Sequence, residues 1–78
     1  MKDHYYCFTP AGMFWIRPNA NLPDRFWLGI EDIVLRSFPS AKKAADGVYL
    51  HATGWDEWDL YDGVGPLDLS EWNEGNPN

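Results

Sequence analysis

Cysteine is nearly absent from this chain of 78 residues, which contains Cys7 and no other cysteine. A disulfide within the chain is therefore excluded, and with it the usual way in which small secreted domains compensate for a small core. Residues 1–4 form no apolar signal segment, and no later stretch reaches the ~18 apolar residues that cross a membrane. We therefore expect a cytoplasmic protein without a membrane partner, in which Cys7 is a core residue.

Basic side chains are also scarce, because six Lys and Arg against twelve Asp and Glu give a net charge of −6. Nucleic-acid binders need a basic face, so this balance argues against a nucleic-acid partner. Leu, Ile, Val and Phe total only 17 of 78 residues, but five Trp and four Tyr offset the shortage because each buries a large area. We expect one domain over residues 1–72, with residues 73–78 frayed.

Recognised catalytic and metal-binding motifs are missing as well. Asp56, Glu57, Asp59 and Asp62 stand close together, but taking Gly63 as the EF-hand glycine puts Trp or Leu at ligand positions. One Cys and two distant His offer no zinc spacing, and no glycine-rich phosphate loop leads into a lysine and a helix. The sequence therefore predicts no metal, no cofactor and no enzymatic activity.

Aromatic and β-branched side chains dominate the first half of the chain and favour strands. The turn residues Thr9-Pro10-Ala11-Gly12 join the first two strands as a hairpin, and two prolines suggest a loop over residues 18–24. The expected strands are residues 4–9, 13–17, 25–29 and 33–38. A helix over residues 26–38 is the alternative, because Ile30, Ile33 and Val34 have helical spacing.

A single helix is predicted from Ser40 to Ala52. Ser40 is a good N-cap, alanines recur on one face, and Gly54 is a natural stop. Gly47 inside this helix implies a packing reason for the missing side chain. The expected fold class is α+β: two layers, with a mostly antiparallel sheet of three or four strands packed on one helix, followed by an ordered acidic–aromatic C-terminal segment.

Alternation along the strands assigns side chains to two faces of the sheet. We expect Phe14, Ile16, Phe26 and Leu28 to lie under the helix. The opposite face then carries two tryptophans and two arginines: Trp15, Arg17, Arg25 and Trp27. A bare aromatic face calls for cover by the rest of the chain or by a partner, and a homodimer through this face is one possibility. Stacking of nucleic acid on the same residues is disfavoured by the net charge.

The acidity of the protein is concentrated in its last 24 residues. Residues 55–78 hold seven carboxylates and no Lys or Arg, whereas residues 1–54 have a formal charge of +1. Aromatic and aliphatic side chains alternate with the acids, which is unusual for a disordered tail. The segment either folds back to complete the core, with some carboxylates pairing with Arg17 and Arg25, or forms a surface for a partner.

These features lead to three functional hypotheses. The first is a non-enzymatic protein-interaction module, an inhibitor or regulator that docks on a basic protein surface. Its expected contact residues combine aromatic anchors with carboxylates: Trp55, Asp56, Glu57, Trp58, Asp59, Asp62 and Trp72. The alternative is a small ligand-binding domain or enzyme with a pocket between the helix and the C-terminal segment near His51. The third is the homodimer through the open sheet face.

Overall fold

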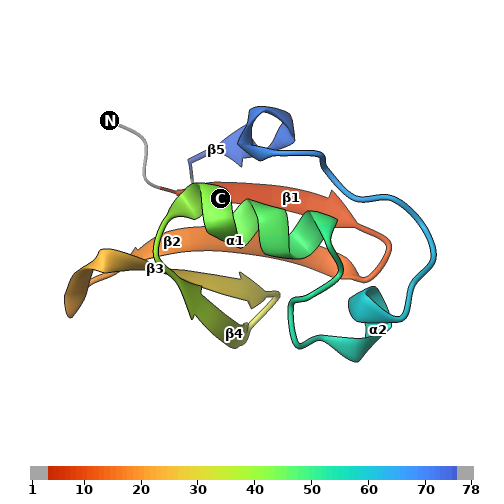
Figure 1. The fold of residues 1–78 in the computed structure, drawn as a ribbon, viewed down its shortest axis with the longest axis horizontal. Coiled ribbons are helices and arrows are strands. Elements are labelled where there is room, and N and C mark those ends of the chain that lie inside the picture. Colours follow the sequence, from red (N-terminus) through yellow and green to blue (C-terminus); the bar gives the residue numbers. More distant parts are fainter. Residues whose placement is uncertain (1–3, 76–78) are drawn as a thin grey trace.

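Five strands form one antiparallel sheet in the computed structural model, which describes residues 4–75 apart from the side chain of Pro23. The strands are β1 (Tyr5–Thr9), β2 (Gly12–Asn19), β3 (Leu22–Ile30), β4 (Ile33–Phe38) and β5 (Asn73–Glu74), in the order β4-β3-β2-β1-β5. The helix α1 (Ala41–Tyr49) lies across one face (Figure 1). The predicted two-layer α+β fold is confirmed, and the helical alternative for residues 26–38 is wrong.

The β2–β3 hairpin is longer than predicted, and the loop expected over residues 18–24 is wrong. Pro18 pairs with Phe26 and Asn19 pairs with Leu22, with a register shift between Pro18 and Asn19. Main-chain groups alternate in direction along a strand, so Pro18 turns its missing N–H away from β3. Pro18 lies beyond Ile16, the partner of Tyr5 at the start of β1, so no ladder bond to β1 is lost.

The start of α1 is as predicted, but its end is not. The Ser40 hydroxyl accepts a hydrogen bond from the Lys43 N–H at 3.1 Å, which confirms the N-cap. The helix ends at Tyr49 rather than Ala52, because His51 takes a left-handed φ of 56°. Gly47 is needed for packing: an added Cβ would lie 2.9 Å from Cζ of Phe38.

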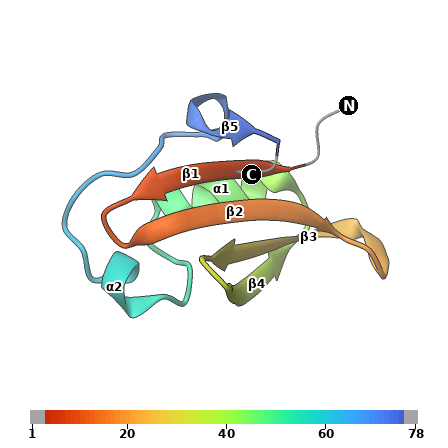
Figure 2. The ribbon, with the colours of Figure 1, turned by 180° about the vertical axis from the view of Figure 1, so that it is seen from behind.

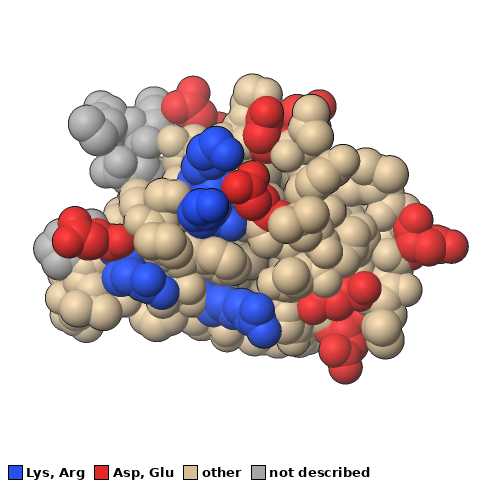
Figure 3. Space-filling view, viewed as in Figure 1, with Lys and Arg blue, Asp and Glu red and all other residues tan. Residues whose placement is uncertain are grey.

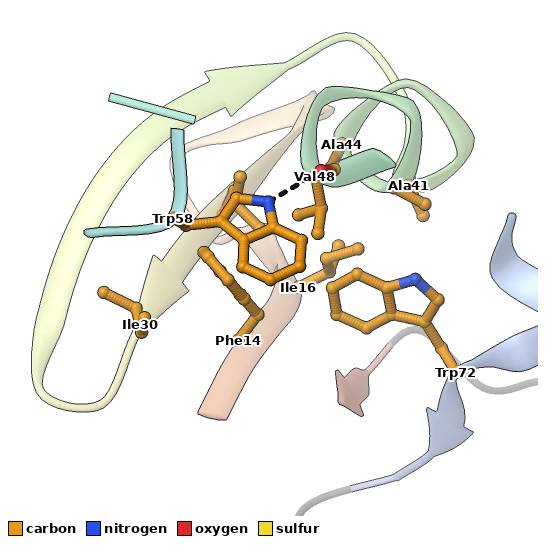
Figure 4. Packing of buried hydrophobic residues seen from close by; sticks show 10 residues of the cluster. Phe14, Ile16, Ile30, Ala41, Ala44, Val48, Trp58 and Trp72 are labelled. Atoms are coloured by element: carbon orange, nitrogen blue, oxygen red, sulfur yellow. Dashed lines mark hydrogen bonds between the residues drawn. The ribbon is translucent and has the colours of Figure 1, made fainter. Parts of the chain in front are cut away.

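The core fills the space between α1 and the sheet. Side chains that are fully shielded come from β2, β3 and the alanine-rich face of the helix: Phe14, Ile16, Leu28, Ile30, Ala44, Ala45 and Val48. Because the helix contributes mostly alanine, bulk must come from elsewhere. Two tryptophans from the C-terminal half supply it, Trp58 and Trp72, which are 0% and 5% exposed (Figure 4).

The C-terminal segment, residues 55–75, passes around one end of the sheet, beyond the β1–β2 turn, and returns to the edge of β1 (Figures 1 and 2). It contains the short helix α2 (Asp56–Asp59), the 3-10 turn η1 (Leu69–Glu71) and β5. The expected fraying at residue 73 is wrong, because Asn73 and Glu74 pair with β1 as the fifth strand. Residues 76–78 lie outside the described residues.

The face of the sheet opposite α1 is not covered by the C-terminal segment. Figure 2 shows this outer face, and neither α2 nor η1 crosses it. On this face the Trp15 ring lies against Gly29, and the Arg17 guanidinium sits 4.4 Å from the centroid of the Trp15 ring. None of the helices in the described chain is long and apolar enough to cross a membrane.

Candidate functional site

A carboxylate fixes the turn that leads into α2. Asp59 accepts hydrogen bonds from the Thr53 N–H at 3.0 Å, the Thr53 hydroxyl at 2.8 Å and the Gly54 N–H at 2.8 Å. The buried Thr53 hydroxyl in turn accepts from the Trp55 N–H at 3.1 Å. Asp59 was predicted to contact a partner, but its oxygens hold the chain entry into α2, so its role here is structural.

Two more of the predicted contact residues belong to the core. Trp58 stacks edge-on against Phe14, with ring centroids 5.7 Å apart, and donates from Nε1 to the Val48 carbonyl at 2.7 Å. Trp72 is packed in the same cluster. Their burial removes both from any contact surface. Trp55 is half-buried, and its Nε1 is buried without a partner in the described chain.

The remaining predicted residues are exposed and lie beside apolar side chains that sequence reasoning did not select. Asp56, Glu57 and Asp62 are exposed, and Leu60 and Val64 are each 83% exposed. These five residues are called the docking surface below. In Figure 3 carboxylates gather at the lower right, over the position of α2 in Figure 1, and a basic side chain lies close to the inner edge of this group. The docking surface is therefore acidic and partly apolar, and Asp59 and Trp58 hold the α2 region beneath it in place.

His51 lies past the end of α1 and holds α2 and the following loop together. Its ring stacks on Trp58 with centroids 4.5 Å apart and an interplanar angle of 11°. Nδ1 lies 2.6 Å from the Trp58 carbonyl oxygen, and Nε2 lies 2.8 Å from that of Gly63. A carbonyl oxygen only accepts, so a ring nitrogen that carries a proton donates to the carbonyl that it faces. These contacts leave neither nitrogen for a substrate.

A separate, open pocket lies between the end of β1 and the loop before η1. It measures about 260 Å³ and does not have His51 in its lining. Its walls come from the end of β1 and the turn after it, from α2, from the loop before η1 and from η1 itself: Cys7, Phe8, Thr9, Pro10, Trp58, Val64, Gly65, Pro66 and Glu71. Burial, and secondarily the Glu71 carboxylate, raise the pKa of the Cys7 thiol, so this half-buried cysteine is a poor nucleophile.

The turn that places Glu71 on the pocket wall is closed by side-chain hydrogen bonds. Asp68 accepts from the Ser70 hydroxyl at 2.5 Å and from the Ser70 N–H at 2.9 Å. These bonds hold the pKa of Asp68 below its ordinary value. Glu71 itself accepts from the Leu67 N–H, so both ends of η1 are tied to neighbouring main chain.

The predicted second face carries its four residues, without the expected ion pairs to the C-terminal segment. Arg25 donates to the Ser37 hydroxyl at 2.9 Å and to the Ser37 carbonyl at 3.1 Å, and Arg17 lies over Trp15. Across residues 4–75 the salt bridge found joins Lys42 and Asp46, 3.5 Å apart. Trp15 and Trp27 are half-buried, so the outer face is less apolar than alternation suggested.

Metal ligands are not assembled in the part of the chain that the structure describes, where no three His, Cys, Asp or Glu side chains are grouped to hold an ion. Comparison of the chain with family models, curated proteins and solved structures gives no match.

Proposed function

We propose that this protein is a non-enzymatic interaction module that docks on a basic, partly apolar protein surface through the docking surface. The observation that carries the proposal is the exposure of Leu60 and Val64, each 83%, beside the carboxylates Asp56, Glu57 and Asp62. Aliphatic side chains that a small domain does not bury supply the apolar contact area of an interface. The surrounding charges speed encounter and exclude acidic partners.

The negative charge of the docking surface favours a partner with a basic surface. Residues 55–78 contain no Lys or Arg, and across residues 4–75 no salt bridge joins Asp56, Glu57 or Asp62 to a basic side chain, although Arg36 lies nearby and donates to the Ala52 carbonyl at 3.3 Å. A surface rich in Lys and Arg on the partner satisfies these carboxylates. The cytoplasm is the compartment that we propose, in keeping with a single free cysteine.

The support beneath the docking surface favours binding without a large ordering cost. Asp59 fixes the start of α2, Trp58 anchors it in the core, and His51 ties it to Gly63. A surface that is held in place before binding loses less conformational entropy on association.

The contacts of His51 favour this proposal over the enzyme or ligand pocket centred on that residue, because both ring nitrogens already contact carbonyl oxygens. A two-fold homodimer through the outer face is also less favoured. It would bring the Arg17 and Arg25 side chains of two copies onto the same surface, where like charges repel.

The test is capture of a partner from lysate of the native source with three forms of the protein. Leu60→Ser/Val64→Ser removes both apolar anchors, and Leu22→Ser/Leu50→Ser is the matched control, since Leu22 and Leu50 are 55% and 68% exposed elsewhere. We expect one dominant basic protein to be retained by the wild type and the control and lost by the first variant. Equal retention by all three forms would contradict the proposal.

A further inference from the structure

One position on the edge of β1 has main-chain groups that face away from β2. The Met13 carbonyl accepts from the Glu31 N–H at 2.9 Å, and the Met13 N–H donates to the Glu31 carboxylate at 2.6 Å. Both Met13 groups therefore point toward the β3 side. Phe8, the partner of Met13 in register, is consequently in a non-hydrogen-bonded pair, and its own N–H and carbonyl point out of the sheet.

β5 uses the outward groups of β1 only up to Tyr6. Tyr5 pairs with Glu74, Tyr6 pairs with Asn73, and the Gly75 N–H donates to the His4 carbonyl at 2.6 Å. Continuing this register would set Glu71 opposite Phe8, but residues 69–71 coil into η1 and leave the edge. In the described chain the Phe8 carbonyl receives only the weak thiol donor of Cys7, at 3.7 Å.

The pocket of about 260 Å³ opens beside this unpaired position. Phe8, Thr9 and Pro10 form one wall, and Val64, Gly65 and Pro66 form the facing wall, with Trp58 also in the lining. A strand edge with a free donor and acceptor next to a partly apolar pocket is the arrangement that accepts an extended peptide. The peptide main chain bonds to the edge, and an alternate side chain enters the pocket.

We propose that an extended peptide segment of a basic partner binds here, with its main chain paired to Phe8 and one aliphatic side chain in the pocket. This inference rests on the proposed function, because Val64 belongs both to the docking surface and to the pocket wall. Asp62 on the docking surface and Glu71 on the pocket wall favour Lys or Arg beside the aliphatic residue.

The test uses an acetylated and amidated pentapeptide with one leucine between two pairs of lysines. Amide hydrogen exchange is followed by NMR in the full chain. Without peptide, the Phe8 amide should exchange faster than those of Cys7 and Thr9, which face β2. At saturating peptide we expect exchange at Phe8 to slow at least tenfold and alkylation of Cys7, which lines the pocket, to slow as well.

Variants separate main-chain pairing from contact with the side chain. Phe8→Pro removes the outward N–H and should weaken peptide binding about tenfold. Phe8→Ala keeps the N–H and loses a ring that is 70% exposed, so binding should change less than twofold. A peptide N-methylated at its leucine should also bind at least tenfold more weakly, which tests pairing even if Phe8→Pro does not fold.

The outcomes distinguish this inference from the proposed function. A Phe8 amide that is already slow without peptide, or that gains no protection, overturns the strand-pairing inference. If the capture experiment still depends on Leu60 and Val64, the proposed function stands without it. Equal binding of a control peptide with serine in place of leucine overturns the pocket contact.

Discussion

At the scale of single residues, the two tryptophans that complete the core differ in one polar atom. Nε1 of Trp58 donates to the Val48 carbonyl at 2.7 Å, near the end of α1. Nε1 of Trp72 is buried and has no partner among the described residues. A buried donor without a partner costs roughly 1–3 kcal/mol, so the two indoles stabilise the fold unequally.

This difference predicts unequal effects of the same substitution. Trp58→Phe removes the indole donor and part of the packing of a fully buried side chain, while the Val48 carbonyl keeps the His51 N–H at 3.1 Å, so the free energy of unfolding should fall by about 2 kcal/mol. Trp72→Phe removes an unpaired N–H together with some packing. It should lower the free energy of unfolding by about 1 kcal/mol less than Trp58→Phe does. Urea denaturation followed by far-UV circular dichroism measures both. Equal losses would contradict the assigned role of the Val48 hydrogen bond.

The outer face depends on one glycine. A Cβ on Gly29 would lie 2.0 Å from the Trp15 ring, whose Nε1 donates to the Glu31 carbonyl at 2.8 Å. Gly29→Ala should therefore displace the indole and lower the free energy of unfolding by about 2 kcal/mol. In a Trp15→Leu background the same change should cost much less. A double-mutant cycle in urea measures this coupling, and strictly additive effects would refute the contact.

At the scale of elements, α2 is short and depends on the side chain of Asp59 rather than on its own length. A helix of four residues does not persist by helix propensity. Asp59→Asn removes a charged acceptor of three hydrogen bonds and should lower the free energy of unfolding by about 2 kcal/mol. Asp56→Asn, at an exposed position in the same helix, should cost less than about 0.5 kcal/mol.

Thermal or urea unfolding of the two variants is the measurement. Similar stabilities would show that Asp59 does not hold the turn. Exchange of the Thr53 and Gly54 amides gives a local reading of the same bonds, because both N–H groups donate to Asp59. Their exchange should accelerate in Asp59→Asn and stay unchanged in Asp56→Asn.

Elements with a clear local signal were predictable from the sequence. The alanine face and Ser40 identified α1, and aromatic alternation identified four strands. The end of α1 was not predictable, since it depends on His51 reaching carbonyls of residues 58 and 63. β5 was missed for a similar reason: Asn73 and Glu74 have little strand propensity and are held by pairing with β1.

Part of the candidate site followed from the sequence in the same way. The cluster of carboxylates located the candidate site in the sequence. Three of the predicted contact residues, however, stabilise the fold: Trp58, Asp59 and Trp72. Their tertiary partners lie in α1, the Thr53 turn and the core, which no local pattern reports. Leu60 and Val64 were not predicted as contact residues, because neighbouring acidic residues in the sequence do not indicate whether an aliphatic side chain is exposed.

At the scale of the whole molecule, the C-terminal segment serves both the fold and the surface. Its buried tryptophans close the core on the helical side, while Asp56, Glu57 and Asp62 stay exposed, on a different part of the surface from the arginines of the outer face. The molecule therefore has an acidic side over α2 and a basic, aromatic sheet face. Binding of a partner to the acidic side should be sensitive to ionic strength, because interactions between exposed charges more than about 8 Å apart are largely screened at physiological salt.

The most direct test of this account compares partner retention at low and high salt for two matched variants. Asp56→Asn/Glu57→Gln/Asp62→Asn removes three carboxylates from the docking surface. Asp24→Asn/Asp32→Asn/Glu74→Gln removes three from elsewhere, so the net charge changes equally from −6 to −3. We predict that the first variant alone loses the partner at low salt, with both folds intact. Equal retention, or equal loss, by the two variants would contradict a docking surface on α2 and the loop after it.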